Sequence, residues 1–222
     1  MTSTFYKNGH YLSVATQVES YLNRQASFLS AETAKSPRAV GDALESIIAE
    51  SFSTFLGDFC REYSRDFARR AMADLAFLDS EEVYTAIDVK THREDTSFNM
   101  PNLTSVERLS RFYENNNNVF ALLMIRYKIE GLNVVVTDVK FAPIEFLDWS
   151  CLTIGALGWG QIQIKNSNRI EINDGYSRKK WMLQLCNFLI DNFYPGEISK
   201  IAKRKDRFES VKQFWLGQPE LY

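Results

Sequence analysis

The chain has 222 residues, of which 45% are hydrophobic and 24% charged, so it is long enough to bury a sizeable core. This composition excludes disordered, collagen-like and low-complexity classes. The 26 basic and 28 acidic residues give a formal net charge of -2. That balance excludes a strongly basic protein that binds nucleic acid by charge alone.

Cysteine usage and hydropathy indicate a cytoplasmic protein that does not enter a membrane. Cys60, Cys151 and Cys186 form no CxxC or CxH cluster, so we expect reduced thiols and no zinc site. No apolar run approaches the length of a membrane span, and the N-terminus lacks the pattern of a secretory signal.

Helical spacing of apolar residues predicts helices over about 11–30 and 40–60. Two short apolar runs follow, Ala73–Leu78 and Val83–Val89, separated by the acidic turn Asp79-Ser80-Glu81-Glu82. This pattern predicts a β-hairpin.

The remaining elements alternate between helix and strand. A helix is expected over about 103–114, stopped by the tract Asn115–Asn118, and a strand pair is expected to join at Gly131. The expected strands are Phe120–Ile129, Leu132–Phe141 and a further pair within 160–172, and the expected C-terminal helices are 176–193 and 197–215. The order predicts a single α/β domain with a central mixed β-sheet flanked by helices.

The most informative feature is a carboxylate–lysine constellation on the predicted hairpin. Asp88 and Lys90 are two residues apart in one strand and therefore share a face, with Val89 turned to the opposite side. If the two strands pair, Asp74 lies beside Asp88. Two adjacent carboxylates repel each other unless a divalent cation lies between them, and a nearby lysine can hold or activate a water. The set is suited to metal-assisted hydrolysis of a phosphodiester.

Two simpler interpretations accompany this hypothesis. Asp138-Val139-Lys140 repeats the D-x-K triplet, but the nearest acidic residue upstream is Glu130, so we interpret it as an ordinary strand-edge pair. For Asp74, Asp88 and Lys90, the alternative is a surface salt bridge on a hairpin.

The motifs around this set resemble type II restriction endonucleases of the PD-(D/E)xK superfamily, in particular the HincII-like enzymes. The EcoRV-like enzymes share the Asp-x-Lys-Thr strand but not the later Pro-Asn. The resemblance covers about residues 40–165 and rests on the order and spacing of several short matches. They are Gly41–Glu45, Ala73-Asp74, Asp88–Thr91, Pro101-Asn102, Phe141-Ala142 and Gln161–Gln163.

Two positions depart from the family pattern. Ala73 stands where the superfamily motif has proline, as it does in the HincII-like enzymes. Thr153 and Gly155 stand where those enzymes have a tyrosine and an asparagine that contact bases. The resemblance therefore implies a different recognition sequence.

The resemblance implies a restriction-endonuclease-like fold with a catalytic core at 40–165 and a helical C-terminal part at 176–222. It implies Mg²⁺ held by Asp74, Asp88 and the backbone carbonyl of Val89. Lys90 would position or deprotonate the attacking water and stabilise the charge that develops on phosphorus.

Three neighbours of this set have weaker assignments. Glu45 is expected either as a further carboxylate behind the metal ligands or as a solvated charge on a helix. Thr91 is expected to support the scissile phosphate. His92 suggests a general base, but we expect it to contact a phosphate or to be exposed.

The loop after the catalytic strand is expected to contact DNA. By the family register, Asn99 takes the intercalating position and Asn102 contacts bases. Phe98 or Met100 would be a better wedge, because apolar side chains unstack bases at low desolvation cost. The alternative is a helix-capping loop with Asn102 as the N-cap.

The segment Thr153–Asn168 is the second expected DNA contact. Glycines, including Gly155, permit close backbone approach. Gln161, Gln163 and Lys165 offer amide groups and a cation, and amides suit adenine edges. Trp159 is expected in the core rather than as a wedge.

The C-terminal stretch 176–215 holds nine basic and four acidic residues, which suits either a solvated face or an arm that contacts phosphates. Its apolar stripe, which includes Trp181 and Leu185, is expected in the core or at a dimer interface. The sequence thus predicts a Mg²⁺-dependent homodimer that cuts a palindromic double-stranded DNA site bluntly, with a cognate DNA methyltransferase as functional partner. The alternatives are a repair or recombination nuclease of the same fold and an inactive DNA-binding module.

Overall fold

The computed structural model describes residues 3–25, 28–64, 73–96, 99–175 and 177–220. The chain divides into two compact units, Met1–Ser177 and Arg178–Tyr222. This boundary lies close to the expected start of the helical C-terminal part.

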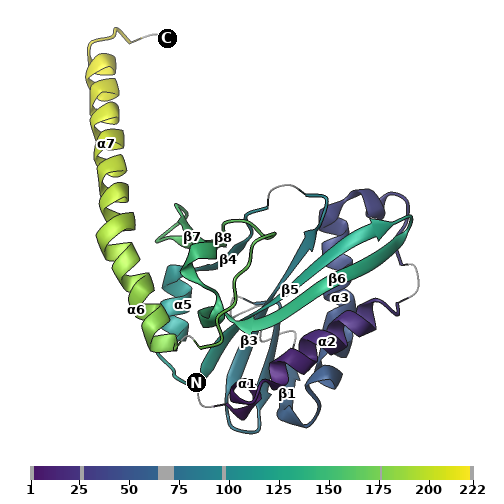
Figure 1. Ribbon diagram of the computed structural model, residues 1–222. Helices are drawn as coiled ribbons and strands as arrows, with labels where there is room; N and C mark the ends of the chain where they lie inside the picture. The colour runs from purple at the N-terminus through teal and green to yellow at the C-terminus, as the bar shows by residue number, and fades with distance from the viewer. Residues whose placement is uncertain (1–2, 26–27, 65–72, 97–98, 176, 221–222) are drawn as a thin grey trace. The chain divides into compact units, whose positions relative to one another are not determined.

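The first unit is built on a five-stranded mixed sheet (Figure 1). Its spatial order is β1-β2-β3-β5-β6, and only β3 and β5 pair in parallel. The strands are β1 (Cys60–Ser64), β2 (Leu75–Asp79), β3 (Tyr84–Arg93), β5 (Asn118–Glu130) and β6 (Asn133–Pro143). The expected α/β class with a central mixed sheet flanked by helices is confirmed, and so are the hairpin β2–β3 and the turn at Gly131.

Two helices cover one face of this sheet (Figure 1). They are α2 (His10–Leu22) and α3 (Pro37–Leu56), preceded by the short α1 (Thr4–Lys7). Ser36 caps α3 by accepting a hydrogen bond from the N–H of Ala39, and Pro37 occupies the first turn. Their apolar faces form one core with the side chains of β3 that point toward them, Ile87 and Val89.

Both N-terminal helices are shorter than the apolar spacing predicts. α2 ends at Leu22, and α3 ends at Leu56 before Gly57, whose φ of 55° suits glycine. The residues from Cys60 form β1 instead of the last turn of a helix.

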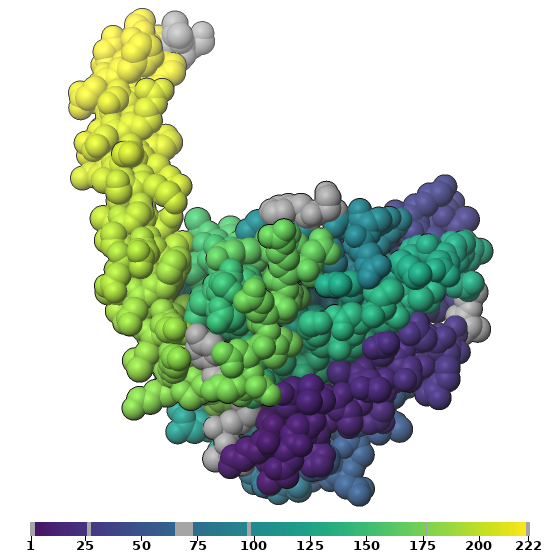
Figure 2. Space-filling model, viewed as in Figure 1, coloured from purple at the N-terminus to yellow at the C-terminus, as the bar shows by residue number. Residues whose placement is uncertain are grey.

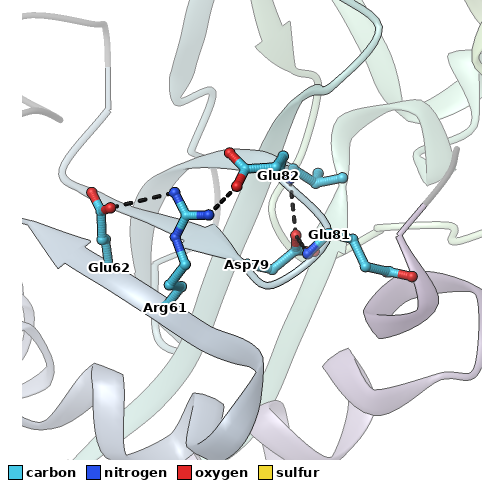
Figure 3. A network of polar contacts seen from close by, with 6 residues as sticks. Arg61, Glu62, Asp79, Glu81 and Glu82 are labelled. Carbon is cyan, nitrogen blue, oxygen red and sulfur yellow. Dashed lines mark hydrogen bonds and ion pairs between the residues drawn. The ribbon is translucent and has the colours of Figure 1, made fainter.

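The turn between β2 and β3 is organised by one buried carboxylate, Asp79 (Figure 3). Its Oδ1 accepts hydrogen bonds of 2.9 Å from the backbone N–H groups of Glu81 and Val83. Its Oδ2 accepts one of 2.7 Å from the hydroxyl of Ser3. A buried carboxylate is tolerated where such donors satisfy it, so Asp79 fixes both the turn and the N-terminal segment.

An arginine ties the edge strand β1 to the same turn. Arg61 forms ion pairs with Glu82 in the turn and with its neighbour Glu62 (Figure 3). All three side chains are well exposed, and exposed ion pairs contribute little to stability. The buried Asp79 therefore dominates the network.

A second sheet of three short strands, ordered β4-β8-β7, differs from the sequence prediction. The strands are β4 (Asn102–Ser105), β7 (Leu152–Gly155) and β8 (Gln161–Ile164), and the helix α5 (Val106–Phe112) follows β4. The expected strand pair within 160–172 is wrong, because the partner of β8 lies upstream of it in the chain.

The C-terminal unit is helical. It contains α6 (Arg178–Phe188), a π-helical turn at Leu189–Phe193 and α7 (Tyr194–Leu216), which follow one another without a break. Two separate helices were expected here. Pro195 lies in the first turn of α7, where a missing N–H is tolerated. In the described part of the chain, no helix combines the length and apolar character that a bilayer crossing requires.

Candidate active site

The hairpin β2–β3 brings Asp74, Asp88 and Lys90 together. The backbone N–H of Asp74 donates a 2.9 Å hydrogen bond to the carbonyl of Ile87, which extends the β2–β3 ladder by one residue. The Oδ2 atom of Asp74 accepts a 2.7 Å hydrogen bond from the N–H of Val89. Lys90 donates from Nζ to Oδ1 of Asp88 at 2.7 Å.

The backbone of Val89 points toward Asp74. In a β-strand, the N–H and C=O groups of one residue lie on the same side of the chain. Because the N–H of Val89 reaches Asp74, its carbonyl lies on the same side of β3 as the carboxylate of Asp74. The three oxygen sources that the sequence assigns to a metal thus lie in one neighbourhood.

Asp88 is the buried carboxylate of this group, and burial disfavours its charged form. It is 5% exposed, and its Oδ2 atom is buried without a hydrogen-bond partner among the described residues. Burial raises the pKa of Asp88 to about 7, although Lys90 opposes the shift; the charges of Asp74 and Glu45 raise it further. A buried carboxylate with one unpartnered oxygen fits a bound cation, which would satisfy that atom.

Glu45 lies on α3, close enough to raise the pKa of Asp88. The approach of this helix to β3 is set one turn earlier, where a Cβ atom on Gly41 would lie only 2.7 Å from Oγ1 of Thr91. Glu45, the fourth residue expected to act in catalysis, therefore lies near Asp74, Asp88 and Lys90.

The cluster offers few protein side chains as ligands for a metal ion. In residues 3–220 outside the gaps named above, no group of three or more His, Cys, Asp and Glu side chains is arranged to hold a metal ion by itself. Mg²⁺ commonly takes one or two carboxylates and completes its shell with waters and phosphate oxygens. Asp74, Asp88 and the carbonyl of Val89 fit that donor set.

Thr91 packs against a helix, and His92 is less accessible than expected. Thr91 contacts α3 at Gly41. His92 is buried, and its Nε2 atom lies 2.8 Å from Oδ1 of Asn168, so the expectation of an exposed histidine is wrong. This hydrogen-bond partner lies 76 positions away in the chain.

The loop after β3 leads into the second sheet. Met100 is 37% exposed, and the backbone carbonyl of Asn99 accepts hydrogen bonds from Ser167. Phe98, the other expected wedge, lies outside the described residues. The predicted N-cap at Asn102 is wrong, because Ser105 caps α5 by accepting from the N–H of Arg108 at 3.1 Å.

Asn102 instead belongs to a row of amides on the β4–β8–β7 sheet. Nε2 of Gln163 donates a 2.7 Å hydrogen bond to Oδ1 of Asn102 across the strands. A Cβ atom on Gly155 would lie 2.7 Å from the Gln163 side chain, so glycine leaves the room that this side chain needs. Thr153 lies opposite Gln163 and Gln161 lies opposite Gly155.

Lys165 follows this sheet and is exposed, but its Nζ atom donates a 2.8 Å hydrogen bond to the carbonyl of Ser150. The structure thus joins Asn102, Thr153, Gly155, Gln161 and Gln163 on one small sheet, which we call the amide sheet. Lys165 lies at its end.

The turn between β7 and β8 corrects one further expectation. Trp159 is 59% exposed and Leu157 is 64% exposed, so Trp159 is not a core residue. Both lie beside a hollow that Ser105, Arg108 and Gln161 also line. The glycines at 158 and 160 are the feature of the sequence that could have indicated this exposure. Their φ values of 59° and 123° make a tight turn that leaves the tryptophan outside.

No protein-family model and no curated protein matches the sequence.

Proposed function

We propose that the protein is a Mg²⁺-dependent type II restriction endonuclease. The observation that carries the proposal is the buried Oδ2 atom of Asp88, which has no hydrogen-bond partner among the described residues and lies beside Asp74 and Lys90. Placing a buried carboxylate beside a second carboxylate and a partly buried lysine is costly unless the group serves a cation and an anionic substrate.

Each residue of the cluster has a distinct role in this proposal. Asp74, Asp88 and the carbonyl of Val89 would hold Mg²⁺, which when bound neutralises phosphate charge and favours ionisation of water. Lys90 orients the attacking water and stabilises the negative charge that develops on the phosphorane. Glu45 adds a carboxylate behind these ligands.

The reaction is hydrolysis of one phosphodiester bond. The water oxygen forms a new bond to phosphorus, the bond to the 3′ oxygen breaks, and the leaving oxygen takes up a proton. The products are a 5′-phosphate and a 3′-hydroxyl. By resemblance to the HincII-like and EcoRV-like enzymes, the cut is blunt.

The amide sheet is the proposed base-reading surface. Gln163 donates to Asn102 through Nε2. This leaves Oε1 of Gln163 as an acceptor and Nδ2 of Asn102 as a donor, in a fixed order. Such a pair complements the N6 donor and N7 acceptor on the edge of adenine. Met100 and Trp159 provide exposed apolar surface nearby in the chain. A homodimer presents two such sheets to a palindromic site, and a cognate methyltransferase would protect the host DNA. We place this activity in the cytoplasm.

Two other functions use the same surfaces. A repair or recombination nuclease would keep the Asp74, Asp88 and Lys90 cluster but cut without sequence preference. A DNA-binding module would bind through the amide sheet but not cut. Both differ from the proposal in what happens to long DNA in Mg²⁺.

Digestion of phage DNA in Mg²⁺ tests the proposal. Discrete bands, with ends that map to one palindrome, are the expected result. A smear would favour a non-specific nuclease, and intact DNA with retained binding would favour the module.

Lys90→Ala tests the assignment of the site. It should abolish cleavage while keeping specific binding in Ca²⁺. Lys128→Ala is the control, because Lys128 is an exposed strand lysine in an ion pair with Glu130. Full cleavage by the Lys90 variant would show that the β2–β3 hairpin does not form the active site.

A further inference from the structure

β6 carries a second Asp-x-Lys pair on the same face of the sheet as Asp88 and Lys90. Val89 and Val139 both belong to the core on the side of α2 and α3. Because side chains alternate along a strand, Asp138 and Lys140 point to the opposite side, as Asp88 and Lys90 do. The sequence alone indicates only an ordinary strand-edge pair here.

The strand register brings the two lysines into one row across the sheet. Lys90 lies beside Met124 on β5, and Met124 lies beside Lys140 on β6. In the next row, Arg126 on β5 lies beside Asp138.

These rows line one hollow. Lys90, Arg126, Asp138 and Lys140 face it, and Ser167 closes part of it from the segment after β8. Figure 2 shows that segment beside β6 on the surface of the first unit. The lining residues, three cations and one carboxylate, give a formal charge of +2 with His92 neutral, which falls to +1 when Asp88, the partner of Lys90, is ionised.

The two lysines lean in opposite directions along the sheet. Nζ of Lys90 is held by Asp88, and Nζ of Lys140 is held by Asp138. β3 is parallel to β5, and β6 is antiparallel to β5, so the step from Asp to Lys runs in opposite senses on β3 and β6. Two diverging ammonium groups suit two separate phosphates better than one.

We propose that Lys140, with Arg126 beside it, binds a second phosphate of the DNA strand that is cut. This inference rests on the proposed function, which places the scissile phosphate at Lys90. The backbones of the two lysines lie two strand spacings apart, about 9–10 Å, and their diverging ammonium groups lie at least as far apart. With one phosphate per about 3.4 Å of axis on each strand, the second phosphate lies about one to three nucleotides from the cut.

Asp138 sets the strength of this contact. Its carboxylate pairs with Lys140 and competes with the phosphate for the ammonium group. Both side chains are about one-third exposed, at 31% for Lys140 and 36% for Asp138, so DNA can displace the carboxylate. Phosphate contacts of this kind fix the position of the duplex and carry no sequence information.

A matched pair on the neighbouring strand supplies the control. Lys128 and Glu130 on β5 form an ion pair across two residues, with side chains 46% and 58% exposed, and neither lines the hollow. The test compares Lys140→Ala and Asp138→Asn with Lys128→Ala and Glu130→Gln. Binding of a labelled random-sequence duplex is measured in Ca²⁺ over a range of salt concentrations.

Lys140→Ala should weaken binding about three- to tenfold and reduce the slope of log affinity against log salt by about 1. Asp138→Asn should tighten binding, Lys140→Arg should retain it, and the two control variants should stay near the wild type. In cleavage assays, Lys140→Ala should raise KM and leave kcat at saturating DNA within about threefold, because the phosphate contact positions the duplex.

The outcomes separate this inference from the proposed function. If Lys140→Ala binds as Lys128→Ala does while the wild type cleaves DNA, the inference is overturned and the nuclease stands. If the wild type never cleaves but its binding depends on Lys140, the nuclease fails and the backbone contact stands. A wild type that binds no DNA overturns both.

Discussion

Oδ2 of Asp74 accepts a 2.7 Å hydrogen bond from the backbone N–H of Val89, the residue between Asp88 and Lys90. One side chain therefore has two tasks. It fixes the local geometry of β3, and it adds negative charge next to Asp88.

Two substitutions separate these tasks. Asp74→Asn keeps an oxygen that can accept from Val89 but removes the charge, whereas Asp74→Ala removes both. If Asp74 holds Mg²⁺ as proposed, both variants should lose DNA cleavage by at least about a hundredfold, because both remove the charge of this ligand. Only Asp74→Ala should lose about 1 kcal/mol of unfolding free energy in urea. An Asp74→Asn protein that cleaves normally would contradict the assigned role.

The pH dependence of stability should report on Asp88. Its pKa is about 7 in the folded chain, because burial disfavours the charged form, and about 3.9 in an unfolded chain. Between these values the folded state holds a proton that the unfolded state has lost. The free energy of unfolding of the wild type should therefore fall as the pH rises from about 4 to 7.

Asp88→Asn stays neutral at all pH values and removes this dependence. In a chelator, the variant should be no more stable than the wild type below pH 4 and more stable above pH 7, by at most about 4 kcal/mol. Urea unfolding at a series of pH values measures the difference. A difference that does not change between pH 4 and 8 would show that the carboxyl group is not held as the structure describes.

Local patterns predicted the centre of the candidate site well. The two-residue period of a strand places Asp88 and Lys90 on one face, and the acidic turn marks the hairpin that brings Asp74 beside them. These features depend on neighbours in the sequence, and the structure retains them.

Features decided by distant residues were missed. β4 forms because Asn102–Ser105 pairs with β8, although Pro101-Asn102 resembles a helix start. His92 is hydrogen-bonded to Asn168, a distant residue that no local pattern links to it. Cys60 continues the apolar spacing of α3. The spacing therefore does not indicate that the helix ends before Gly57 and that β1 begins at Cys60.

Gly155→Ala tests the amide sheet. A Cβ atom at this position would lie within 2.7–3.0 Å of all three terminal side-chain atoms of Gln163, so the side chain must move and its hydrogen bond to Asn102 must change. We expect specific cleavage to fall at least tenfold, with a much smaller loss of non-specific binding.

Gly196→Ala is the matched control, because a Cβ atom there meets nothing within 4 Å and the position lies in α7. It should leave cleavage unchanged. If Gly155→Ala keeps both the rate and the sequence preference of the wild type, the amide pair does not read bases.

Trp159→Ala tests the turn between β7 and β8. Because the side chain is 59% exposed, the variant should unfold at nearly the same urea concentration as the wild type. If the indole stacks on a base, DNA binding in Ca²⁺ should weaken by about five- to a hundredfold, and Trp159→Phe should restore most of it. Leu132→Ala is the control, since Leu132 is 44% exposed at the turn between β5 and β6. Equal binding by the Trp159 and Leu132 alanine variants would exclude a stacking role for this tryptophan.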